Sequence, residues 1–290
     1  MDPSVAPEPA LPPLWRESRV ALELSELLRS RIFRAPPPAP EPGLAVLLIT
    51  GVYANDATMR PMAAWLRRMG YAPKRAGLRF NADCSEAEMG RLELRLERAV
   101  KRSGRRAAIV GWSRGGLFAR ALAVRRPDLV AGIATLGSPL LSPLGYVHPV
   151  LHLALEATST LGDRGVPGLL SHGCADEWAL DGAASRSPVS RALIARTRRL
   201  LDLGERCCER FWNDVRAPFP GDVSFVSLYS KTDAIVNWLA CLDPAARHLE
   251  VDASHCGLGV SRHVFCVLAA ELDQIAAAER PANGERALAA

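Results

Sequence analysis

A pentapeptide, Gly111-Trp112-Ser113-Arg114-Gly115, constrains the fold of this chain more than any other feature, because of the segments on either side of it. Residues 107–110 form a short apolar run that predicts a strand, and residues 117–122 begin an apolar pattern with helical spacing. The two glycines allow the strand and the helix to approach each other where a Cβ would clash. The sequence therefore predicts a tight strand-turn-helix unit that lifts the Ser113 hydroxyl to the N-terminal end of the helix, where the helix dipole favours negative charge.

Strand-like and helix-like segments alternate along most of the chain. Segments that are typical of strands lie at residues 44–49, 107–110, 131–136, 223–229 and 247–251; the first two are apolar runs, and 223–229 alternates in part. Apolar residues recur at helical spacing at residues 59–69, 85–104, 117–122 and 261–278. Such alternation is typical of a parallel sheet that is covered by helices. We therefore predict an α/β fold with a mostly parallel central sheet flanked by helices.

The chain divides into an N-terminal arm, one large domain and a short tail. Residues 1–42 form a Pro-rich arm, in which residues 14–34 have the apolar spacing of an amphipathic helix. Residues 43–280 are predicted to form the α/β domain, and residues 281–290 a disordered tail. Within the domain, the segment at about 140–221 is too long for a loop of an α/β unit, so we expect it to fold as a cap-like insertion.

The charge balance and the chain start bear on partners and location. The chain has 36 basic and 31 acidic residues, and the basic ones lie largely in Arg pairs at expected helix ends, without aromatic residues that would stack on bases. We therefore expect no nucleic-acid partner. No apolar stretch is long enough to span a bilayer and the first residues do not resemble a signal peptide, so we expect a cytoplasmic protein. The helix at 14–34 is expected to pack on the domain, with peripheral contact to a membrane surface as the alternative.

The seven cysteines show no pair at the spacing of metal ligands. We therefore expect free thiols and no metal site. Cys207 and Cys208 are expected to face different directions. A disulfide between Cys241 and Cys256 is a second hypothesis, because both follow segments that should meet at one edge of the sheet.

A serine hydroxyl is a poor nucleophile, and it needs a base to accept its proton and a carboxylate to hold that base. With this requirement in view, the sequence resembles the α/β-hydrolase superfamily, in particular its bacterial lipase and carboxylesterase-like branches, over roughly residues 43–278. Residues 230–236 resemble the acid loop of that family, and Asp233 matches its acid. Residues 252–259 resemble its histidine loop, and His255 matches its base.

The resemblance also implies the groups around the nucleophile. The backbone N–H groups of Arg114 and Val52 are expected to form the oxyanion hole, and Tyr53 and Trp112 to lie against the substrate. The early loop has Thr50-Gly51 where many members of the family have His-Gly. Arg114 stands where an apolar residue is common, and its side chain should either attract an anionic substrate or reach solvent.

The implied function is a serine hydrolase that cleaves carboxylic esters through a Ser113–Asp233–His255 triad and an acyl-enzyme, without a cofactor or a metal. The implied substrate is a small-molecule or lipid-like ester, and the insertion is expected to shape its pocket. An acyltransferase, a thioesterase or an amidase with the same triad is an alternative, as is a protein that binds an acyl-bearing ligand without turning it over. The sequence leaves the oligomeric state open.

Overall fold

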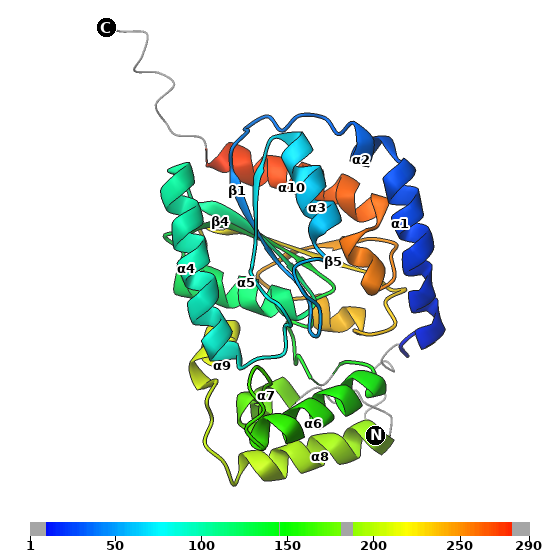
Figure 1. Ribbon diagram of the computed structural model, residues 1–290, viewed down its shortest axis with the longest axis vertical. Coiled ribbons are helices and arrows are strands. Elements are labelled where there is room, and N and C mark those ends of the chain that lie inside the picture. The colour runs from blue at the N-terminus through cyan, green and yellow to red at the C-terminus, as the bar shows by residue number, and fades with distance from the viewer. Residues whose placement is uncertain (1–9, 145, 181–187, 280–290) are drawn as a thin grey trace, which may run out of the picture.

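The computed structural model describes residues 10–144, 146–180 and 188–279. Within them, six parallel strands form one sheet in the order β2-β1-β3-β4-β5-β6 (Figure 1). The strands are β1 (Ala45–Ile49), β2 (Ala72–Arg75), β3 (Ala107–Trp112), β4 (Val130–Leu136), β5 (Ser224–Tyr229) and β6 (Arg247–Glu250). The predicted α/β fold with a parallel sheet is confirmed. β2 was not predicted, because its residues, Ala-Pro-Lys-Arg, include neither an apolar run nor a β-branched side chain.

The position of β2 explains why such a sequence can form a strand. It lies at the edge of the sheet and pairs only with β1. Proline lacks an N–H group, and an edge strand tolerates it because one side has no neighbouring strand. The central strands β1 and β4, by contrast, are buried along their whole length, as expected for strands covered on both faces.

Helices cover the two faces of the sheet and form two separate cores. On one face, α3 (Arg60–Met69) and α10 (Arg262–Ala278) pack against side chains such as Val46 and Val110. On the other face, α4 (Ser85–Ser103), α5 (Arg114–Arg125) and α9 (Glu209–Arg216) pack against side chains such as Leu47 and Ile109. Adjacent residues of a strand point to opposite faces, so each strand contributes to both cores.

The N-terminal arm packs beside α10 (Figure 1). In place of the single helix expected at 14–34, it forms a 3-10 helix, η1 (Leu14–Arg19), followed by α1 (Val20–Arg29) and the short α2 (Arg31–Arg34). Leu27 and Phe33 of the arm are buried in the same core as α10. The expected tail at 281–290 and the first nine residues lie outside the described residues.

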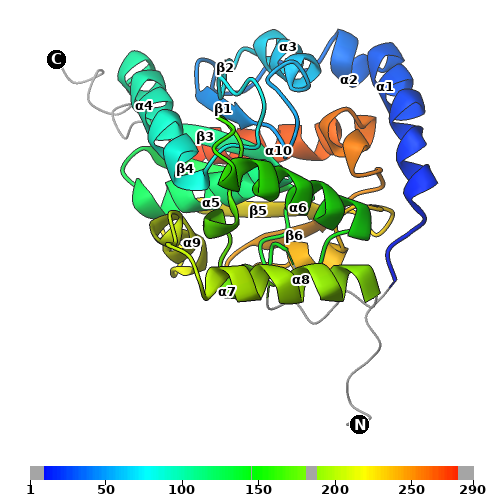
Figure 2. The same ribbon diagram turned by 60° about the horizontal axis from the view of Figure 1, so that its bottom comes forward.

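The insertion forms a cap of helices over the carboxyl ends of the strands (Figure 2). It contains α6 (Pro149–Asp163), η2 (His172–Cys174), α7 (Glu177–Leu180) and α8 (Pro188–Leu201), and the chain then returns to the sheet through α9. Two short 3-10 helices, η3 (Trp238–Cys241) and η4 (Cys256–Gly259), follow β5 and β6. In the described part of the chain, no helix is both long and apolar enough to cross a membrane.

Candidate active site

Ser113 lies on a strained turn between β3 and α5. Its φ of 55° and ψ of −123° belong to a region that residues with a side chain rarely adopt. The turn is held by a hydrogen bond from the Ser113 N–H to the Leu136 carbonyl (2.8 Å). A Cβ at Gly115 would overlap the Ile49 carbonyl, and a Cβ at Gly111 would overlap the Gly115 carbonyl. The glycines of the pentapeptide therefore permit the close approach that the sequence pattern predicts.

Asp233 and His255 form a buried pair on the loops after β5 and β6. His255 Nδ1 lies 2.6 Å from Asp233 Oδ2, and Asp233 Oδ1 accepts hydrogen bonds from the N–H groups of Ile235 and Val236, both at 2.8 Å. Burial lowers the pKa of His255. The charge and hydrogen bond of Asp233, together with the charge of Glu17, raise the pKa by more than burial lowers it, so the net shift is upward. This arrangement orients the imidazole and stabilises its protonated form.

The other acids and histidines near strand ends have different partners. Asp222 pairs with Arg106 at 2.8 Å and Asp243 with Arg120 at 2.6 Å, while the side chain of Asp252 is largely exposed. His248 Nε2 lies 2.7 Å from the Asp243 carbonyl oxygen. Of these acids and histidines, Asp233 and His255 have side chains that contact each other directly.

Trp112 and Gly137 connect the nucleophile turn with the acid-histidine pair. Trp112 Nε1 donates a hydrogen bond to the His255 carbonyl (3.1 Å), and the two rings lie 5.9 Å apart. A Cβ at Gly137 would lie 3.1 Å from Asp233 Oδ2 and 3.4 Å from His255 Nδ1. Within the part of the chain that the structure describes, the Ser113 hydroxyl makes no hydrogen bond to His255. Ser113, Asp233 and His255 thus lie at the same end of the sheet without a complete triad of hydrogen bonds.

Two backbone donors lie beside Ser113. A Cβ at Gly51 would lie 3.1 Å from the Ser113 Cβ, so glycine lets the loop after β1 approach the nucleophile. The N–H groups of Val52 and Arg114 have no hydrogen-bond acceptor among the described residues, and both residues line the cavity that Ser113 reaches. Tyr53 lies just beyond them, and its hydroxyl bonds to Thr158 of α6 (2.9 Å).

The guanidinium of Arg114 binds the loop before α4 and the first residue of that helix. Its guanidinium donates hydrogen bonds to Asn81 O (3.1 Å) and Oδ1 (2.9 Å), to Asp83 O (2.8 Å) and to Ser85 Oγ (3.0 Å). Burial lowers the pKa of Arg114. The guanidinium is therefore held by these hydrogen bonds and does not extend freely into solvent, whereas attraction of an anionic substrate stays a prediction.

The N-terminal arm supplies two carboxylates that sequence analysis missed. Glu17 accepts hydrogen bonds from the N–H groups of Ala234 (3.0 Å), His255 (3.0 Å) and Cys256 (2.8 Å). Glu23, which is only 7% exposed, accepts from the N–H and the hydroxyl of Ser254 at 2.8 and 2.7 Å. The arm therefore ties together the loops that carry Asp233 and His255. Its helical pattern accounts for the packed face, but no sequence signal identifies the partners of the two acids.

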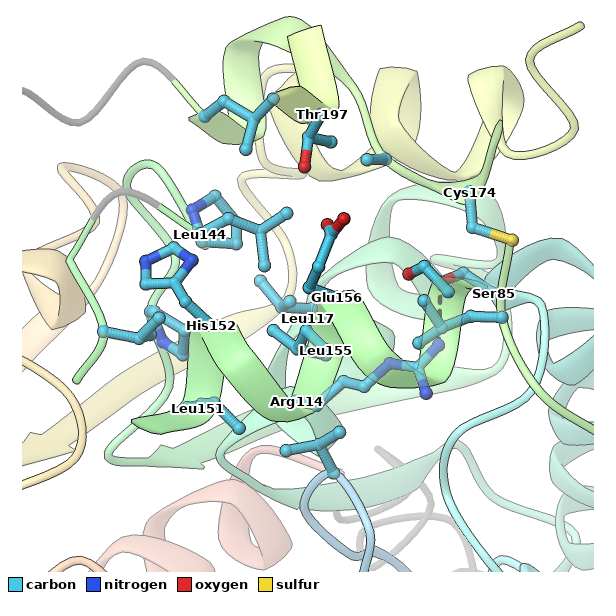
Figure 3. Close-up of a pocket in the computed structure, with 18 of the residues that line it drawn as sticks. Ser85, Arg114, Leu117, Leu144, Leu151, His152, Leu155, Glu156, Cys174 and Thr197 are labelled. Carbon is cyan, nitrogen blue, oxygen red and sulfur yellow. Dashed lines mark hydrogen bonds between the residues drawn. The ribbon is translucent and has the colours of Figure 1, made fainter. Parts of the chain in front are cut away.

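A cavity of about 110 Å³ lies between Ser113 and the cap (Figure 3). Its walls are mostly apolar and come from both parts of the domain, with Leu117 of α5 on one side and Leu151, Leu155 and Ile194 of the cap on the other. A concave, mostly apolar space with a few polar groups is typical of a ligand site.

Polar side chains of the cap, among them His152, Glu156 and His172, also line this cavity. His172 lies between two carboxylates, with Nδ1 2.5 Å from Asp163 and Nε2 3.0 Å from Glu156. His152 is buried, and its Nε2 has no hydrogen-bond partner among the described residues. Burial lowers the pKa of His152 to about 4, so its imidazole is neutral near pH 7. Its Nε2 is thus an unpaired polar atom in the wall of the cavity, as far as the described residues show.

No protein-family model and no curated protein matches the chain. Solved structures are similar, among them a soluble variant of monoglyceride lipase from Saccharomyces cerevisiae, at 15% identity and a TM-score of 0.52 over 84% of this chain and 90% of that one. Tomato methylketone synthase I has a TM-score of 0.50 at 14% identity over 81% and 99%. A lipase of Bacillus licheniformis in its propeptide form has a TM-score of 0.51 at 16% identity, and the match covers 81% of this chain and 52% of that one. The parallel sheet, the turn at Ser113 and these likenesses show that this chain has the α/β-hydrolase fold.

Proposed function

We propose that this protein is a serine hydrolase that cleaves carboxylic esters, with Ser113 as nucleophile, His255 as base and Asp233 as the acid that orients it. The observation that carries the proposal is the strained turn that presents Ser113 to an apolar cavity, next to the 2.6 Å pair of His255 and Asp233. A strained side-chain-bearing residue is retained in a fold where the surrounding structure imposes it, and such positions cluster at active sites.

The proposed reaction proceeds in two steps through an acyl-enzyme. His255 Nε2 accepts the proton of Ser113 while Oγ attacks the ester carbonyl carbon, and the N–H groups of Val52 and Arg114 bind the resulting oxyanion. The imidazolium, stabilised by Asp233, then gives its proton to the departing alcohol. In the second step His255 accepts a proton from water, whose oxygen attacks the acyl carbonyl carbon, and His255 then returns that proton to Ser113 Oγ as the acid is released. The contact from Ser113 to His255 forms when substrate binds, since catalytic hydrogen bonds often tighten only in that complex.

The cavity supports an apolar acyl group as the part of the substrate that is recognised. Leucine and isoleucine side chains of α5, α6 and α8 surround the space in front of Ser113. Burial of an apolar chain there gains about 0.8 kcal/mol for each methylene removed from water. Two of the similar solved structures are lipases by name, which agrees with a small or lipid-like ester as substrate.

The arm keeps an exposed apolar edge that suits peripheral contact with a lipid surface. Trp15 is 71% exposed and Leu22 66% exposed. We include this contact in the proposal, and co-sedimentation with lipid vesicles tests it. Substitution of both residues by Glu should abolish binding, and equal binding by the variant and the parent protein would eliminate this contact.

The experiment that tests the nucleophile compares Ser113→Ala with the parent protein and with Ser103→Ala, a control at the far end of α4. The parent and the control should react with a fluorophosphonate and hydrolyse p-nitrophenyl esters, whereas Ser113→Ala should do neither while keeping its circular dichroism spectrum. Labelling of Ser113→Ala at the parent rate would refute the assignment. A panel of esters, thioesters and amides with increasing acyl length then separates ester hydrolysis from the other acyl-transfer reactions.

A further inference from the structure

Four cysteine sulfur atoms gather where the cap meets the sheet domain. The Sγ atom of Cys207 lies 3.3 Å from that of Cys174, 3.7 Å from that of Cys208 and 3.8 Å from that of Cys84. The Sγ atoms of Cys84 and Cys208 are 3.4 Å apart, and every pair within the group lies within 4.8 Å. Cys207 and Cys208 thus point to the same place, contrary to the sequence expectation that they face different directions.

These distances match the coordination shell of one metal ion. A tetrahedral zinc site with Zn–S bonds of about 2.3 Å places its sulfur atoms about 3.8 Å apart. Two disulfides would instead require two S–S bonds of about 2.05 Å, with the sulfur atoms of one bond clearly farther from those of the other. Here Cys207 is nearly equidistant from three other sulfur atoms. We propose that Cys84, Cys174, Cys207 and Cys208 bind one Zn²⁺ ion in a tetrahedral four-thiolate site.

The surroundings of the cluster favour the thiolate charge that zinc binding requires. Cys84 is the N-cap residue of α4 and Cys208 is that of α9, and the positive end of a helix dipole stabilises a thiolate. One zinc ion with four thiolates carries a net charge of −2. The guanidinium of Arg114 bonds to the residues on both sides of Cys84, and its four hydrogen-bond acceptors are all uncharged. None of the hydrogen-bond partners of Arg114 carries a negative charge, and the net negative charge of the metal site would balance the positive charge of its guanidinium.

The backbone around the cluster holds the ligands in place without the metal. The N–H of Cys207 donates to the Gly173 carbonyl at 3.2 Å, and Trp212 Nε1 donates to the Cys174 carbonyl at 2.8 Å. A Cβ at Gly173 would lie 2.5 Å from the Glu205 carbonyl oxygen, so only glycine lets the two cap segments approach this closely. Such outer contacts orient metal ligands.

The position of the cluster assigns the metal a structural role. Cys174 and the Cys207-Cys208 pair belong to the two ends of the cap segment that contains α7 and α8, whereas Cys84 belongs to the sheet domain. Cys174 also lines the cavity, on the side where the Arg114 guanidinium bonds to Ser85 (Figure 3). A shell of four protein ligands has no open position for substrate or water. The ion would therefore fasten α8, one wall of the cavity, to the sheet domain, whatever reaction the cavity supports.

Metal analysis of the full chain tests the site directly. The protein is produced in zinc-supplemented medium and purified under reducing conditions without a metal-affinity step. Inductively coupled plasma mass spectrometry should then find about one zinc per chain. Cys84→Ser should retain about a tenth of that amount or less, whereas Cys266→Ser, an exposed cysteine of α10 outside the cluster, should retain all of it. Because the readout is metal content, its outcome is independent of esterase activity.

A second measurement uses the parent protein, so it does not depend on whether a variant folds. Exchange of the bound ion for Co²⁺ should give the sulfur-to-metal charge-transfer band and the visible bands of a tetrahedral thiolate site. Parent protein that contains less than about 0.1 zinc per chain and develops no such bands with Co²⁺ would overturn the proposal. Peptide mapping that finds the four cysteines joined in disulfides in freshly purified protein would overturn it as well.

Discussion

The carboxylate of Glu17 accepts a hydrogen bond from the backbone N–H of His255 at 3.0 Å, although the two residues are 238 positions apart in the chain. The same carboxylate binds the N–H of Ala234, the residue after the proposed acid. Burial lowers the pKa of His255, whereas the carboxylate of Asp233 and, to a smaller extent, the charge of Glu17 raise it. Glu17 is thus placed to position both proposed partners of Ser113 and to tune the base.

Glu17→Gln should change the pH dependence of ester hydrolysis as well as its rate. The variant removes one of the negative charges that raise the pKa of His255, so the acidic limb of the kcat/KM profile should move to lower pH. Loss of one or two of the three backbone hydrogen bonds should lower kcat about tenfold. Glu26→Gln, an exposed residue of α1, is the control and should match the parent. An unshifted acidic limb in Glu17→Gln would assign Glu17 a purely structural role.

The parent enzyme should lose activity as the pH falls through a pKa above the ordinary histidine value of about 6.5. The sign follows from the mechanism, since His255 must be neutral to accept the Ser113 proton and its pKa is raised. Asp233→Asn should move this limb to lower pH and reduce kcat about 10³-fold or more.

Asp252→Asn provides the matched control for Asp233. Asp252 precedes the same histidine loop, but its carboxylate is largely exposed and pairs with Arg19 at 3.2 Å. The profile of Asp252→Asn should follow that of the parent. If Asp252→Asn lost activity and Asp233→Asn did not, the acid would be wrongly assigned.

His152→Phe should raise stability and narrow the substrate range. The imidazole Nε2 is buried without a partner among the described residues, and such a group costs about 1–3 kcal/mol. We expect the free energy of unfolding to increase by about 1 kcal/mol, and kcat/KM to fall for esters with a hydroxyl or oxo group on the acyl chain relative to plain alkyl esters. Urea denaturation and an acyl-chain panel measure both effects. In the control His248→Phe, loss of the hydrogen bond to Asp243 should lower stability instead.

Gly115→Ala should destabilise the protein, because the added Cβ would overlap the Ile49 carbonyl. Relief requires α5 to move away from β1, at a cost of about 1–3 kcal/mol of unfolding free energy. Gly90→Ala is the contrasting variant, since its Cβ would meet no atom within 4 Å and would stabilise α4 by about 1 kcal/mol. Urea denaturation of both variants checks the pair, and equal stabilities would contradict the tight turn at Ser113.

Local patterns were sufficient to predict five of the six strands and the turn at Ser113. Apolar runs and helical spacing indicate which faces of an element are buried, and both patterns can be recognised within a short stretch of the chain. β2 escaped prediction because an edge strand needs little burial, so Pro73, Lys74 and Arg75 carry no strand pattern. Asp233 and His255 were proposed because their loops resemble the acid and histidine loops of the α/β-hydrolase family, and their 2.6 Å contact agrees with that proposal.

The sequence by itself determined the alternation of strands and helices and the residues at the ends of the strands. Tertiary structure decided which distant side chains meet at those ends. Glu17 reaches His255 only because the arm packs against α10, and four cysteines from three separate segments meet only because the cap closes onto α4 and α9. Periodicity records which face of an element is buried, but contacts between remote segments depend on how the elements pack, and no spacing along the chain encodes that.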